Sequence, residues 1–204
     1  MWQYVNLDNI DTEWAIGVMI ASCPDFPEFE GRMLTAIAQD RGWTIEDAVR
    51  EVVTSPRGRQ VICIQFIIDE ADIETNLRHP RMLVGSDGIP QLKGMPHPRL
   101  FGTMPRVLAR YVRERQVLSL EEALRRMTSA SCERFGLVDR GLVKEGCWAD
   151  LVLFDPDTVE DLATYEDSKR EPKGIAMVVV NGHVAYEEGK HTGVGSGRAL
   201  RFKR

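Results

Sequence analysis

The spacing of apolar residues in the first third of the chain alternates between helical and extended patterns. Apolar positions three and four apart predict helices over residues 32–41 and 45–53, the second beginning after Thr44 as N-cap. Residues 14–22 show a looser alternation that favours a strand. Residues 61–68 form a continuous apolar run rich in β-branched side chains, which predicts a buried strand.

The middle of the chain continues the same alternation. Residues 69–77 are compatible with a short helix that ends before a proline, and residues 82–85 with a short buried strand. Pro105 is then expected to open a helix that runs to about Arg115. Ser119, with glutamate three residues later, has the spacing of a capping box and predicts the start of a further helix.

After Gly136 strands predominate. Residues 149–155 predict one strand, and the apolar runs 175–180 and 183–186, separated by Asn181-Gly182, predict a hairpin. Helices mixed with strands define an α/β fold class, and the change of character places a domain boundary near Gly136.

Composition narrows the classes of protein. The net charge of −5 over 204 residues argues against a dedicated nucleic-acid binder. The sequence has no apolar stretch long enough for a membrane span and no signal-peptide pattern at its first residues. The four cysteines are scattered without a CxxC pair, which favours reduced, mostly buried thiols and a cytoplasmic location.

Two residues are candidates for chemistry. Asp87 follows the strand predicted at residues 82–85, and catalytic groups of α/β barrels project from that end of a strand. An ordinary Asp-Gly turn is the alternative. Arg99, in the loop His97-Pro98-Arg99, could bind a carboxylate through two parallel hydrogen bonds, and a solvated surface arginine is the alternative.

Other motifs predict no chemistry by themselves. The four histidines lack HxH or HExxH spacing and are expected to be surface or loop residues. The glycine-rich residues 193–197 favour a flexible turn over a phosphate cradle. The basic residues after this turn, from Arg198 on, are expected to be solvated, and Trp148 to be a packing residue.

Several motifs together resemble one family. They are VGSDG (residues 84–88), HPR (97–99), FGTMPRVL (101–108), GCWADLV (146–152) and VNG (180–182). The last two are shared by many amidohydrolases. The first three are narrower, and the combination resembles the C-terminal portion of the N-acyl-D-amino-acid deacylases, or D-aminoacylases, of the amidohydrolase superfamily.

The resemblance implies an incomplete (β/α)₈ metal-dependent-hydrolase barrel, with its last strand and helices plus an insertion, followed by a small β-sandwich or barrel portion. Residues 1–60 resemble the insertion, residues 61–135 the C-terminal part of the TIM barrel, and residues 136–204 the small β domain.

The resemblance also implies an activity: zinc-dependent hydrolysis of the amide C–N bond of N-acyl-D-amino acids. Asp87 matches the aspartate that contacts the zinc and passes a proton to the leaving amine, and Arg99 matches the arginine that holds the substrate carboxylate. The family's other metal ligands have no counterpart in this sequence. Zinc and activity are therefore expected only together with a complementary N-terminal half, which could be a separate chain or could have been lost.

Two alternatives remain. The chain could be a non-catalytic binding or assembly module, or part of a dihydroorotase- or hydantoinase-like enzyme that acts on cyclic amides. The presence of both Asp87 and Arg99 favours the deacylase, because a scaffold has no chemical need for them.

Overall fold

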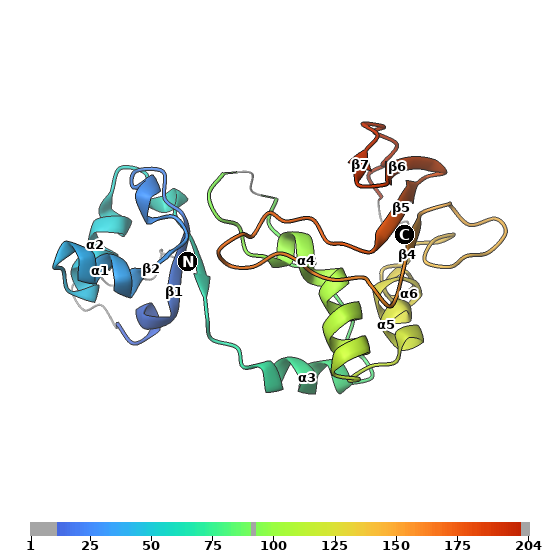
Figure 1. The fold of residues 1–204 in the computed structure, drawn as a ribbon, viewed down its shortest axis with the longest axis horizontal. Coiled ribbons are helices and arrows are strands. Elements are labelled where there is room, and N and C mark those ends of the chain that lie inside the picture. Colours follow the sequence, from blue (N-terminus) through green and yellow to red (C-terminus); the bar gives the residue numbers. More distant parts are fainter. Residues whose placement is uncertain (1–11, 91–92, 201–204) are drawn as a thin grey trace. The chain divides into compact units, whose positions relative to one another are not determined.

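A computed structural model describes residues 12–90 and 93–200, which form two compact units built from segments distant in sequence (Figure 1). The first unit comprises the described residues of Met1–Asp69, Gly88–Leu100 and Ala163–Arg170. The second comprises Glu70–Asp87, Phe101–Leu162 and the described residues of Glu171–Arg204. The division into residues 1–60, 61–135 and 136–204 concerns parts of a larger fold, and it stays a prediction.

The first unit contains a three-stranded antiparallel sheet. Strand β1 (Val18–Ser22) lies between β2 (Arg32–Met33) and β3 (Ile62–Gln65), and Met19 pairs with both Met33 and Ile64. Every residue of β1 is buried. The strand expected over residues 14–22 is confirmed from Val18 on, after a single 3-10 turn.

Two helices pack with β1 to form the core of this unit. They are α1 (Leu34–Arg41) and α2 (Ile45–Thr54). The helix expected over residues 32–41 begins two residues later, because residues 32 and 33 belong to β2. Thr44 caps α2: its hydroxyl accepts a hydrogen bond from the Asp47 N–H at 3.0 Å, and the Asp47 carboxylate accepts one from the Thr44 N–H. The fully buried side chains include Ile20, Phe29, Leu34, Ile37, Val49 and Val52.

The buried strand expected over residues 61–68 is shorter than predicted. The main-chain N–H of Phe66 donates to the Gly17 oxygen at 2.8 Å, and the chain then leaves the sheet. Ile67 and Ile68 are 70% and 69% exposed. A continuous apolar run predicts that other elements pack on both faces of the strand. In the described part of the first unit, no element packs over the side chains of Ile67 and Ile68.

The second unit holds the remaining helices. They are α3 (Glu70–Arg78), most of α4 (Arg99–Arg106), the π-helical segment η5 (Val107–Glu114), α5 (Leu120–Met127) and α6 (Ser129–Arg134). The Ser119 hydroxyl accepts from the Glu122 N–H at 3.2 Å, so the predicted cap of α5 is confirmed.

The prediction that Pro105 opens a helix is wrong, because α4 begins at Arg99 and Pro105 lies inside it. Proline has no N–H to bond the carbonyl four residues earlier, which loosens the helix at this point. The chain continues with wider hydrogen bonding, as in the bond from the Arg115 N–H to the Arg110 oxygen at 2.8 Å. From this wide helix Arg113 donates to the oxygens of Pro156 and Val159, at 3.1 and 2.8 Å.

Residues 82–85 do not form the buried strand that was expected. They are half-buried or exposed, and Met82 and Val84 pack against the core formed by α3, η5 and α5. A barrel strand needs parallel neighbours to accept its hydrogen bonds. All strand pairs in the described residues are antiparallel, so this part of the chain is a mixed α/β arrangement that contains no closed barrel.

The second unit ends in an antiparallel sheet of order β4-β5-β6-β7. Its strands are β4 (Leu151–Phe154), β5 (Ile175–Val180), β6 (His183–Glu187) and β7 (Lys190–His191). Asn181 and Gly182 have φ angles of 47° and 82°, the left-handed conformation that a two-residue hairpin turn requires, so the predicted hairpin is confirmed. These strands carry the orange and red colours in Figure 1.

The glycine-rich residues 193–197 form no helix or strand and are attached to this hairpin at Ser196. The Asn181 side-chain amide donates to the Ser196 oxygen at 2.6 Å, and the Ser196 hydroxyl donates to the Val180 oxygen at 2.8 Å. Arg198 is exposed, as expected, and its guanidinium lies 4.9 Å from the centre of the Trp148 ring. Trp148, expected to be a packing residue, is itself 43% exposed. Arg201, Lys203 and Arg204 lie outside the described residues.

All four cysteines are free thiols, of which only Cys23 is buried, so the expectation of mostly buried thiols is wrong. Cys63 is half-buried, and the partial loss of solvent around its thiol raises the pKa of that thiol to about 12. Among the described helices, none combines the length and apolar character needed to cross a membrane.

Candidate functional site

Asp87 is the last residue of the second unit's segment Glu70–Asp87. It is exposed, and its φ of +45° places it in the left-handed region. Aspartate is one of the few residues other than glycine that adopt this conformation at modest cost. Aspartate is therefore compatible with this backbone conformation, which also suits an ordinary Asp-Gly turn.

A buried arginine holds the segment that leads to Asp87. The Arg126 side chain is 4% exposed, and its guanidinium donates to the oxygens of Leu77 and His79 at 2.6 and 3.1 Å. It also donates to the Glu122 carboxylate at 2.6 Å. Hydrogen bonds from Arg125, and then from Arg126, lower the pKa of Glu122 to about 2.

Arg99 is the first residue of α4 and is half-buried. Its main-chain N–H donates to Nδ1 of His97 at 3.0 Å, and the next N–H, of Leu100, donates to the His97 oxygen at 3.0 Å. The first N–H groups of a helix have no partner within the helix. His97 supplies two acceptors for this helix start and so fixes the main chain that carries Arg99.

The loop before Arg99 is also attached to strand β1. The Met95 N–H donates to the Ala21 oxygen at 2.7 Å. Gly94 has a φ of +72°, and a Cβ added there would lie 2.4 Å from the Ala21 oxygen. Only glycine fits this approach, so the loop is docked on the sheet at one defined point.

The other histidines behave as the sequence predicts, since His79, His183 and His191 are exposed. His97 lies in a loop, which the prediction also allows, but it is half-buried and in contact with Tyr165, whose ring centre is 5.3 Å away. Neither His97 nor Tyr165 was expected from the sequence to be part of the site. The HPR motif could have drawn attention to His97, whereas no local signal marks Tyr165.

The structure brings Arg99 into the first unit and Asp87 into the second. Their joint participation in one site stays a prediction. In residues 12–90 and 93–200, no group of three or more His, Cys, Asp and Glu side chains is arranged to hold a metal ion. A catalytic zinc needs about three protein ligands. The described residues therefore do not fit a complete zinc site by themselves.

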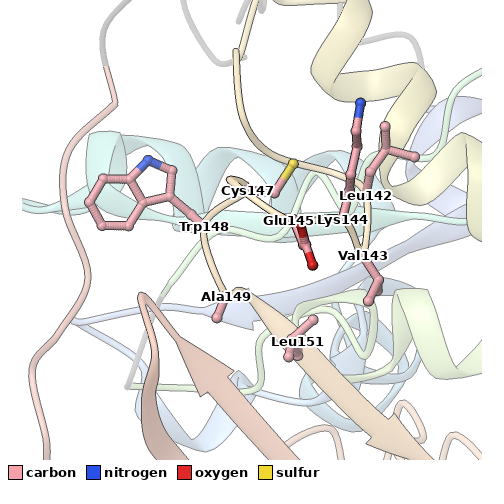
Figure 2. A pocket seen from close by; sticks show the side chains of 8 residues that line it. All are labelled: Leu142, Val143, Lys144, Glu145, Cys147, Trp148, Ala149 and Leu151. Atoms are coloured by element: carbon pink, nitrogen blue, oxygen red, sulfur yellow. The ribbon is translucent and has the colours of Figure 1, made fainter.

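A hollow of about 260 Å³ lies elsewhere in the second unit, in the loop before β4 (Figure 2). Its lining is mostly apolar and consists of Leu142, Val143, Lys144, Glu145, Cys147, Trp148, Ala149 and Leu151. The volume is below the usual range of ligand sites, and neither candidate residue contributes to the lining. This hollow is therefore not the predicted site.

Comparison with known proteins identifies the protein family to which the chain belongs. Residues 28–186 match the model of the Amidohydrolase family, and the chain belongs to that family. Within it, the chain is a D-aminoacylase-like amidohydrolase. It is 42% identical over 182 residues to the D-aminoacylase of Alcaligenes xylosoxydans xylosoxydans, a match that covers 89% of this chain and 36% of that protein.

Comparison with solved structures gives the same family. A crystal structure of D-aminoacylase superimposes with a TM-score of 0.84 at 41% identity, over 93% of this chain and 39% of the other. The N-acyl-D-glutamate deacylase of Bordetella bronchiseptica, solved with zinc and a phosphonate inhibitor, gives 0.77 at 39% identity, over 85% and 35% of the chains. The chain thus spans little more than a third of the length of these relatives.

Proposed function

We propose that this chain is the C-terminal portion of a metal-dependent deacylase that hydrolyses the amide C–N bond of N-acyl-D-amino acids. The observation that carries this proposal is the similarity to D-aminoacylase, which extends over 93% of the chain with a TM-score of 0.84. The motifs around Asp87 and Arg99 lie within the family match.

Arg99 is proposed to bind the substrate's α-carboxylate. A guanidinium presents two parallel N–H donors that match the two oxygens of a carboxylate. Such recognition requires a fixed direction, and the attachments at Gly94, Met95 and His97 hold the loop that carries Arg99.

Asp87 is proposed to transfer the proton from the attacking water to the leaving amine. A carboxylate can accept a proton and release it again in the same catalytic cycle. Zinc would activate the water in an enzyme of this kind. Because the described residues do not form a zinc site, its ligands are proposed to come mainly from polypeptide outside these 204 residues.

Complementation tests this function. The chain is mixed with the N-terminal part of the D-aminoacylase to which it is 42% identical, and hydrolysis of N-acetyl-D-leucine, N-acetyl-D-aspartate and N-acetyl-D-glutamate is measured with zinc. We expect turnover of a D-substrate by the mixture and none by the chain alone. Turnover by the chain alone would refute the need for outside ligands. An inactive mixture would contradict the deacylase and favour the non-catalytic module.

Two variants test the residues. Asp87→Asn should lower kcat of the complemented enzyme by about 100-fold or more. Arg99→Ala should mainly raise KM for the carboxylate substrate, with the exposed Arg59→Ala as the matched control. An Asp87→Asn variant with undiminished kcat, or an Arg99→Ala variant with unchanged KM, would remove that residue from its role.

A further inference from the structure

The His97 ring forms hydrogen bonds through both nitrogens. Nδ1 accepts from the Arg99 main-chain N–H at 3.0 Å, and Nε2 lies 3.4 Å from the Tyr165 hydroxyl oxygen. A main-chain N–H can only donate, so Nδ1 carries no proton. The neutral ring then has its proton on Nε2, which donates to the Tyr165 oxygen. The geometry thus selects one of the two neutral tautomers.

Tyr165 is itself held on the sheet of the first unit. It packs against the buried side chains of Met19, Ala21 and Ile64, and its ring meets that of Phe66 edge-on at 4.7 Å between centres. These contacts come from β1, which is buried throughout, from the buried Ile64 of β3, and from Phe66, which is 43% exposed. The hydroxyl that faces His97 is therefore carried by a ring with little freedom to move.

A tight turn presents Tyr165 to the loop. The Thr164 N–H donates to the Asp167 oxygen at 3.1 Å, and the Asp167 N–H donates to the Thr164 hydroxyl at 3.0 Å. This turn belongs to the segment Ala163–Arg170, which joins the first unit from far along the sequence. The loop carrying Arg99 is thus fixed by β1 at Met95 and by this turn at His97.

We propose that His97 and Tyr165 are positioning residues for Arg99: the doubly bonded His97 ring fixes the start of α4 and, through it, the direction of the Arg99 guanidinium toward a substrate carboxylate. This role rests on the proposed function of Arg99. Neither residue touches the reacting atoms in the proposal. Tyr165 acts through His97, and His97 acts through the main chain of Arg99.

The first test uses the 204-residue chain without activity. Long-range ¹H–¹⁵N NMR should show His97 with an unprotonated Nδ1 and a protonated Nε2. Relaxation of the Arg99 Nε–H should show an ordered side chain that becomes mobile in His97→Ala. His97→Asn should restore the order, because an asparagine oxygen can accept from the N–H two residues on. The Nε–H of Arg59 serves as the control. A protonated Nδ1, or unchanged Arg99 order in His97→Ala, would overturn the proposal.

The second test uses the complemented enzyme. His97→Ala should raise KM for the N-acyl-D-amino acid by about tenfold, the equivalent of one hydrogen bond, with kcat little changed. KM for the corresponding carboxamide substrate should stay unchanged, so the preference of the enzyme for the carboxylate over the carboxamide should fall. In an Arg99→Ala background the same change should have no further effect. An equal rise in KM for the carboxylate and the carboxamide would refute the positioning of Arg99 by His97.

Tyr165→Phe keeps the ring packing and removes the hydroxyl, so it should shift the His97 tautomer signals and raise KM less than His97→Ala does. Unchanged signals in Tyr165→Phe would remove Tyr165 from the proposal. The two tests separate the failures. If the NMR result holds and the complemented enzyme is inactive, the proposed function is wrong while the fixed arginine stands. If the NMR result fails, positioning is wrong whatever the activity.

Discussion

Replacing Arg126 by methionine should destabilise the second unit. The side chain is 4% exposed and donates to the oxygens of Leu77 and His79. Methionine keeps a linear apolar chain but offers no donor, so these two oxygens lose their charged partner. A hydrogen bond from a charged donor contributes about 1.5–3 kcal/mol, and the two lost bonds give an expected destabilisation of about 3 kcal/mol.

The assay is hydrogen exchange of the α3 and α5 amides in increasing urea, read by mass spectrometry, which gives the opening free energy of this unit separately. Arg125→Met is the matched control. Arg125 lies on the same helix and bonds the same Glu122 carboxylate, at 2.7 and 2.9 Å, but it is 48% exposed. We expect the opening free energy of Arg125→Met to stay close to that of the unsubstituted protein, because exposed ion pairs contribute little to stability.

A loss below about 1 kcal/mol for Arg126→Met, or one no larger than that of Arg125→Met, would refute the argument. It would mean that water replaces the guanidinium at both carbonyls. It would also remove the reason to regard Arg126 as the support of the segment that leads to Asp87.

Three further predictions concern charge and local geometry. The pKa of Glu122 is about 2 in the folded chain against an ordinary 4.5, so its stabilising contribution is present above pH 4.5 and is lost as the pH falls toward 2. Glu122→Gln should flatten the dependence of unfolding free energy on pH in that window, and an unchanged slope would contradict this. Gly94→Ala should detach the loop from the Ala21 oxygen and speed exchange of the Met95 amide, with an unaltered rate as the contrary result. Trp148→Leu should release Arg198 from the ring, so that trypsin cuts after Arg198 faster, and equal cutting would count against the stacking.

Local signals in the sequence predicted the local structure well. Thr44 caps a helix and Asn181-Gly182 turns a hairpin, because each depends only on side chains and φ angles within a few residues. Predictions that depended on contacts with residues distant in the sequence were less accurate. Residues 82–85 look like a strand only if parallel partners lie beside them, and residues 66–68 look buried only if something covers them. The antiparallel sheets of the described residues supply neither.

The candidate site shows the same limit. The HPR motif drew attention to Arg99, but the half-buried state of His97 depends on Tyr165, which lies 68 residues further along the chain. No spacing rule connects two residues so far apart. The role of Asp87 came from family resemblance, and its left-handed backbone could not be read from an Asp-Gly pair that also suits an ordinary turn.

The wide helix η5 has a consequence for how related sequences are compared. A helix bonded five residues apart holds one residue more than an α-helix of the same number of turns. Deleting one residue within Val107–Glu114 would restore the narrower α-helical winding over the same number of turns, so the end of the helix would keep its direction relative to its start. Arg113 would still face the oxygens of Pro156 and Val159. A single-residue gap at this helix in an alignment therefore marks a relative whose ordinary α-helix holds the loop after β4 in the same way.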